Sequence, residues 1–183
     1  CQRQAHTYYP THLWKNETRD VLNNYIVTKQ EGLGDLDPFK SESYSKYNQN
    51  DYAPTLMHNE ALDFISRNED SPFFLYYASP IPHLPLQAPT KWVEYYQKKF
   101  GKEIPYTGKS YYPNKTPRAT YAAMISYLDE QVGELVEKLV KPVRKSKFTE
   151  VNVAEERYEP RIPDKKYDDS EDFGEDIEDE DDF

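Results

Sequence analysis

The sequence predicts an α/β fold in which helices flank an incomplete sheet, with an acidic tail after it. Residues 73–78, FFLYYA, form a continuous apolar run between Pro72 and Pro80. Such a run is typical of a strand buried on both faces of a parallel sheet. Residues 56–68 and 118–139 carry apolar side chains at helical spacing, so each predicts a helix with one face toward a core. Helix, turn and buried strand, in that order, make half of an α/β unit.

The charge of the chain is concentrated at one end. The 183 residues hold 23 Lys and Arg against 33 Asp and Glu, a net charge of −10, and residues 155–183 alone hold 15 acids and 4 bases. We therefore expect a body at 1–140 and a basic, then acidic, disordered tail at 141–183. The chain has no excess of basic residues that would indicate nucleic-acid binding. It also has no apolar run of about 18 residues that would indicate a membrane span.

The other predicted elements follow from local signals. Residues 1–50 are polar and aromatic with no sustained period, and we expect one short strand at 24–28. Thr55 and Thr90 are the predicted N-caps of helices at 56–68 and 91–100. Four prolines hold 79–89 as an extended loop, and Pro142 is predicted to end the 118–139 helix.

The predicted core does not close on itself. A buried strand needs neighbouring strands to satisfy its N–H and C=O groups, and the rest of the chain does not clearly supply them. The sequence therefore favours a slice of a larger α/β domain, and a first residue of Cys1 rather than Met agrees with that expectation. A small α+β domain with poorly marked strands is the alternative.

His83 is the leading candidate for a functional side chain. It follows the predicted strand by five residues, in a loop stiffened by Pro80, Pro82 and Pro85. Ligands in open α/β sheets bind beyond the carboxyl ends of the strands, where an imidazole can donate to an anion or act as an acid or base. The alternative is a histidine that only hydrogen-bonds a backbone carbonyl.

Other candidates carry weaker signals. His6 and His12 could bind a metal, but aromatic packing of their loop is the favoured interpretation. His58 is predicted to lie on the helix surface, and Asp129 to cap a helix or form a salt bridge. Three basic residues could bind an anion: Arg3, Lys15 and Arg118. Two glycosylation sequons begin at Asn16 and Asn114.

Several segments together resemble one family. Residues 72–89, PFFLYYASPIPHLPLQAP, are similar to the strand and "PH" loop of formylglycine-dependent sulfatases. Residues 61–65, ALDFI, look like the helix before that strand, and 121–135, YAAMISYLDEQVGEL, like the helix after it. Residues 1–16, CQRQAHTYYPTHLWKN, resemble a subgroup of bacterial arylsulfatases. The order and spacing of the segments agree over about residues 1–139.

The resemblance implies a partial alkaline-phosphatase-like domain, the middle third of a sulfatase catalytic domain. In that family a formylglycine hydrate attacks sulfur, calcium holds the sulfate oxygens, and Lys and His side chains offset the developing charge. By this resemblance, His83 occupies the position of the family's sulfate-contacting histidine in the "PH" loop. The C-x-P-S-R nucleophile motif, the early Asp-Asp pair and the Asp-Asn-Gly metal motif do not occur in the 183 residues.

We therefore expect a fragment of a sulfatase, an enzyme that hydrolyses sulfate esters on sulfated small molecules or glycans, and we expect this fragment to be inactive by itself. The resemblance also implies a periplasmic or secreted parent protein, although no signal peptide is recognisable here. The alternative is a non-catalytic binding module on the same slice, with the acidic tail as an interaction arm. A third class, an acidic chaperone-like or nucleic-acid-mimic protein, rests on the tail only.

Overall fold

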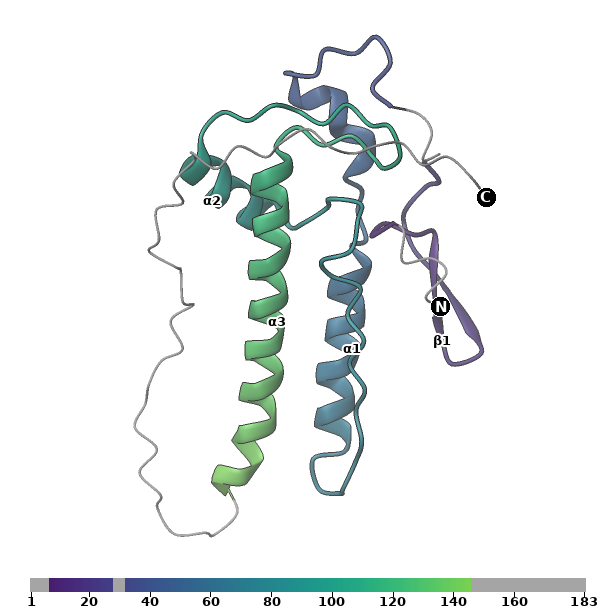
Figure 1. The fold of residues 1–183 in the computed structure, drawn as a ribbon. Coiled ribbons are helices and arrows are strands. Elements are labelled where there is room, and N and C mark those ends of the chain that lie inside the picture. The colour runs from purple at the N-terminus through teal and green to yellow at the C-terminus, as the bar shows by residue number, and fades with distance from the viewer. Residues whose placement is uncertain (1–6, 28–31, 146–183) are drawn as a thin grey trace, which may run out of the picture. The chain divides into compact units, whose positions relative to one another are not determined.

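The computed structural model describes residues 7–27 and 32–145, with side chains as far as Val140. A small antiparallel hairpin precedes a 3₁₀ helix and three α-helices (Figure 1). The elements are β1 (His12–Lys15), β2 (Thr18–Val21), η2 (Ser41–Tyr47), α1 (Ala53–Arg67), α2 (Thr90–Phe100) and α3 (Pro117–Lys145). No described helix combines the length and apolarity needed to cross a bilayer.

The β1–β2 hairpin was not predicted. Lys15 faces Thr18 across a two-residue turn, and Asn16 in that turn has φ of 56°. Asparagine is one of the few residues that accept this left-handed conformation, so Asn16 allows the chain to reverse here.

The predicted strand at 24–28 is wrong for its described residues, 24–27. Side chains rather than a neighbouring strand satisfy this backbone: Tyr25 N–H donates to Gln49 Oε1 at 2.7 Å, and Gln49 Nε2 donates to the Tyr25 carbonyl at 3.1 Å. Asn24 makes the same kind of two-way contact with the backbone of Asp51. Amide side chains thus replace the partner strand.

The three α-helices occur where the sequence predicts them, with shifted ends. α1 begins at Ala53, and its N-cap is Tyr52 rather than Thr55, because Pro54 is accommodated in the first turn. α2 begins at Thr90, with Pro89 rather than Thr90 as the N-cap. Figure 1 shows α1 and α3 side by side, and Ala61, Ile65 and Leu135 form a buried cluster between them.

The predicted end of the last helix at Pro142 is wrong, because α3 continues to Lys145. One proline removes a single i to i−4 bond, and here the helix loses that bond near its end without terminating. Five residues of the predicted tail are therefore helical. Residues 146–183 lie outside the described residues, so the disordered tail and the boundary at residue 140 stay predictions.

An aromatic core joins segments far apart in the sequence. Tyr8 and Tyr9 from the N-terminal segment pack on Tyr52 before α1, at 5.7 and 5.4 Å between ring centroids, and Tyr52 packs on Tyr127 of α3 at 5.9 Å. The buried members are Tyr8, Tyr9, Tyr52, Ile81, Ala88, Ala123, Met124 and Tyr127. This core fixes the loop that carries His83.

Residues 73–78 are extended but belong to no sheet of the described chain. Leu75 and Tyr77 pack against the α1–α3 cluster, whereas Phe74 and Tyr76 are 86% and 78% exposed. The prediction of a strand buried on both faces is therefore wrong for this structure, since only alternate side chains are covered. The described residues supply neither lateral strands nor a second layer.

The apolar stripe of α3 is likewise only partly covered. Met124 and Leu135 are buried, and Leu128 is half-buried. The exposed members of the stripe are Tyr121, Ile125, Val132, Val136 and Leu139. Helices and sheets bury such faces against another layer, so the described part of the chain leaves this stripe without its covering layer.

Candidate functional site

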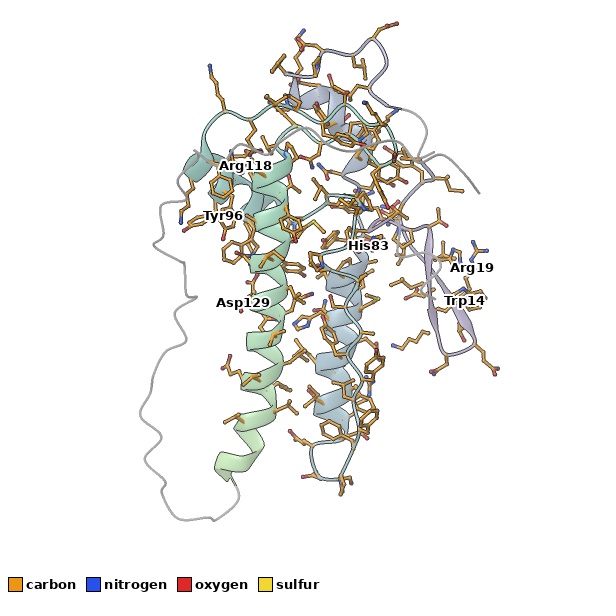
Figure 2. The ribbon with its side chains drawn as sticks, viewed as in Figure 1. Trp14, Arg19, His83, Tyr96, Arg118 and Asp129 are labelled. Atoms are coloured by element: carbon orange, nitrogen blue, oxygen red, sulfur yellow. The ribbon has the colours of Figure 1, made fainter. Side chains whose placement is uncertain are left out.

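The candidate site is the loop after the extended run, which carries the exposed side chain of His83 (Figure 2). The loop contains cis peptide bonds before Pro82 and Pro85. His83 N–H donates to the carbonyl of Pro80 at 2.9 Å, which closes a tight turn. Ile81 and Pro85 are buried on either side, so the loop is anchored while the imidazole faces outward.

The side chain of Tyr8 hydrogen-bonds to the backbone of this loop. Its buried hydroxyl lies 2.5 Å from the His83 carbonyl and 3.1 Å from the Pro80 carbonyl. Burial raises the pKa of Tyr8, so the hydroxyl keeps its proton as a donor. A donor shared between two carbonyls fixes both ends of the turn.

Gln87 fixes the far end of the loop. Its buried amide accepts from Tyr8 N–H at 3.1 Å and donates to the Tyr47 carbonyl at 2.5 Å. Tyr52 hydroxyl in turn donates to the Gln87 carbonyl at 2.8 Å. The loop is thus tied to three separate segments, and a side chain on it has little freedom to move.

The hydrogen bond of His83 assigns the tautomer of its ring. Nδ1 lies 2.5 Å from the carbonyl of Leu84, which can only accept, so Nδ1 carries a proton. Nε2 then has the lone pair in the neutral ring and a proton in the imidazolium. The ring can therefore exchange a proton, or donate one to an anion, through Nε2.

His83 borders an open hollow of about 660 Å³ between the loop and α3. Its lining consists of the end of the extended run, the start of the loop and two side chains of α3: Tyr76, Tyr77, Ala78, Ser79, Pro80, Ile81, His83, Leu128 and Val132. The hollow is thus continuous with the exposed aromatic face and the uncovered α3 stripe. His83 stands where these surfaces meet.

The structure also contains a polar cluster that the sequence did not reveal. His58 is only 3% exposed, so its predicted place on the helix surface is wrong. Its Nε2 lies 2.6 Å from Glu134 Oε2, and its Nδ1 lies 3.4 Å from the Tyr77 hydroxyl. His58 shares the helical face of Ala61 and Ile65, at spacings of three and seven, and that spacing was the available signal. The cluster links α1, α3 and the extended run.

The remaining candidates do not gather at His83. His12 lies in β1, Lys15 forms an ion pair with Glu60 at 2.6 Å, and Arg118 lies over the Phe100 ring at 5.6 Å. Asp129 is half-buried on α3. His6 and Arg3 lie outside the described residues, so the possible His6–His12 metal pair stays a prediction.

The described residues do not fit a calcium site. Within 7–27 and 32–145, no three Asp, Glu, His or Cys side chains come together in a way that could hold a metal ion. Calcium is held by six to eight oxygen ligands, several of them carboxylates.

Comparison with known proteins identifies the chain. The family model described as Sulfatase matches residues 3–147. This places the chain in a hydrolase family within the alkaline-phosphatase-like superfamily. The chain belongs to the sulfatase family, as its resemblance predicts. That family generally uses calcium and formylglycine.

One solved structure, described as the crystal structure of Ps i-CgsB, is 31% identical to this chain. The match covers 55% of this chain and 20% of that one, with a TM-score of 0.39. The chain thus spans about a fifth of that solved chain. No curated protein matches it.

Proposed function

We propose that this chain forms part of a sulfatase catalytic domain and contributes His83 to the hydrolysis of sulfate esters, with sulfated small molecules or glycans as substrates. The observation that carries the proposal is the position of His83. It extends from a loop tied to three other segments, directly after the extended run, in a chain of the sulfatase family.

His83 suits the charge changes of this reaction. Water and R–O–SO₃⁻ give R–OH and HSO₄⁻, so the S–O bond to the leaving group breaks and the leaving oxygen gains a proton. With Nδ1 donating to Leu84, an imidazolium would present its second N–H at Nε2 to the sulfate or to the leaving oxygen. A fixed loop lets this donor act with little reorganisation.

The proposal includes inactivity of the 183 residues by themselves. They contain no C-x-P-S-R motif, and the described residues assemble no group of metal ligands. An acid needs a positioned nucleophile and substrate to act on. The nucleophile and calcium ligands would come from the rest of the domain, in a periplasmic or secreted protein.

Two assays test this proposal. The purified 183-residue chain should not hydrolyse 4-nitrophenyl sulfate, and turnover would contradict the proposed inactivity. In the protein expressed from the complete reading frame around these residues, His83→Ala should lower kcat/KM by about 100-fold or more. Leu84→Ala, a change at the exposed neighbour, is the matched control. Equal activity of the His83 and Leu84 variants would overturn the role of His83.

A second candidate function is a non-catalytic binding module with the acidic tail as its arm. One observation favours it: the bonds from Tyr8 and Gln87 close a core within this chain. A module of this kind must unfold cooperatively when purified alone. A broad, non-cooperative transition with exposed apolar surface would favour the fragment instead.

A further inference from the structure

The outward face of the β1–β2 hairpin gathers side chains that the proposed chemistry does not use. His12 faces Val21 and Trp14 faces Arg19 across the two strands. Side chains alternate between the faces of a strand, so these four residues share one face. Figure 2 shows Trp14 and Arg19 together on the hairpin.

This face combines an aromatic surface with a positive charge that no carboxylate of the described residues pairs with. Trp14 is 49% exposed, and the His12 ring packs against it edge-on, at 5.9 Å between centroids and 82°. Arg19 Nη2 lies 3.3 Å from His12 Nδ1. No carboxylate of the described residues forms an ion pair with Arg19, and its neighbour Asp20 lies on the opposite face of the hairpin.

The contacts of His12 also orient its ring. Arg19 has only N–H donors, so His12 Nδ1 accepts the hydrogen bond. The neutral His12 ring therefore carries its proton on Nε2, which adds another donor beside the guanidinium.

The hairpin is tied to the His83 loop through the chain. Tyr8, whose hydroxyl contacts the His83 carbonyl, precedes His12 by four residues. Four extended residues span at most about 14 Å, so the hairpin begins within that distance of Tyr8. On its opposite face, Lys15 forms an exposed ion pair with Glu60 of α1 at 2.6 Å.

We propose that this hairpin face binds a sugar ring of the sulfated substrate, with Trp14 stacked on the ring and Arg19 bound to an anionic substituent of the sugar. Indole offers a flat apolar surface, and the planar guanidinium matches the paired oxygens of a sulfate or carboxylate. The proposal rests on the proposed sulfate-ester function and names sulfated saccharides as the substrate class. Cross-strand pairing of Trp14 and Arg19 could by itself only stabilise the hairpin, and the test separates the two roles.

The test is an NMR titration of the full 183-residue chain with a monosulfated chondroitin disaccharide and its unsulfated counterpart. The sulfated disaccharide should shift the indole N–H signal of Trp14 and leave that of Trp92 in place. Arg19→Ala should weaken binding about tenfold, as loss of a charge-assisted bidentate contact predicts. Trp14→Ala should weaken it about threefold or more. Arg19→Lys should restore only part of the affinity, because it keeps the charge without the planar fork.

Two controls accompany the titration. Lys15→Ala changes the opposite face of the hairpin and should leave saccharide affinity within about twofold. Helical circular dichroism of each variant verifies that the chain is folded. The inference is overturned if both disaccharides shift Trp14 equally, if neither does, or if Arg19→Ala binds as tightly as the parent chain.

A second measurement tests the same site in the complete enzyme. There, Arg19→Ala should raise KM for the sulfated saccharide about tenfold with kcat unchanged, while Lys15→Ala leaves both unchanged. An unaltered KM in Arg19→Ala, beside a lowered kcat/KM in His83→Ala, would refute the hairpin site and leave the sulfatase role of His83 standing.

Discussion

The hydroxyl of Tyr8 donates to the backbone carbonyl of His83 across 75 positions of sequence. This bond joins the segment that leads into the hairpin to the loop that carries the candidate acid. The two segments are far apart in the sequence, so no local sequence pattern predicts that they come into contact. The contact therefore makes the geometry of His83 depend on the whole aromatic core rather than on its own loop.

Tyr8→Phe tests this dependence. The change removes a buried donor from two carbonyls, so we expect a loss of about 1–3 kcal/mol in the free energy of unfolding. Urea denaturation followed by circular dichroism measures it. Tyr95→Phe, on the exposed face of α2, should change stability by no more than about 0.5 kcal/mol. Similar small effects of the two variants would contradict a clamping role for Tyr8.

His58 and Glu134 should be energetically coupled. The two side chains meet at 2.6 Å and join α1 to α3. A double-mutant cycle with His58→Ala and Glu134→Ala should give a coupling energy of about 0.5–3 kcal/mol, because each single change leaves the other polar group without its hydrogen bond. Replacing Glu60 in place of Glu134 supplies the control, since Glu60 pairs with Lys15 and Arg67 instead. Additive effects of His58→Ala and Glu134→Ala on the free energy of unfolding would contradict the predicted coupling.

Substitutions on the two faces of the extended run, residues 73–78, should lower the free energy of unfolding by different amounts. In the isolated chain, Leu75→Ala should cost about 2 kcal/mol because it removes packing against the α1–α3 cluster. Phe74→Ser at the exposed neighbour should stay within about 0.5 kcal/mol. In the complete protein, Phe74→Ser should become costly if further sheet or helix layers cover this face. Thermal unfolding of both variants, in the isolated chain and in the complete protein, measures these differences in stability.

Stability should fall at alkaline pH. Burial raises the pKa of Tyr9 and of Tyr77 to about 12, and burial also raises the pKa of Tyr8 and Tyr52. The unfolded state loses these protons first, near pH 10, so it binds fewer protons than the native state above that pH. Stability is therefore complete below pH 10 and declines between about 10 and 12.

Urea midpoints between pH 8 and 12, with tyrosinate absorbance recorded in parallel, measure this decline. Tyr9→Phe removes one titrating group and should make the decline shallower. A stability that stays constant to pH 12 would contradict the burial of these hydroxyls.

Local patterns in the sequence were sufficient to predict the three helices and the proline-rich loop that carries His83, whereas the role of His83 stays a prediction. Helical spacing of apolar residues and the restriction of φ at proline act over a few residues, so they can be read without a fold. The hairpin was missed because its turn depends on the left-handed conformation of Asn16, and its strands are too short and polar to show alternation. The helix end at Pro142 was misplaced because one proline weakens a helix without always ending it.

Tertiary structure decided which of these side chains meet. The sequence by itself determined that residues 73–78 are apolar and extended, but only packing decided that Leu75 and Tyr77 face the helices while Phe74 and Tyr76 remain open. Packing likewise buried His58 and brought Tyr8 beneath His83. The physical reason is that local preferences are set by neighbours in the chain, whereas burial and long-range hydrogen bonds depend on which distant surfaces are present to cover a face.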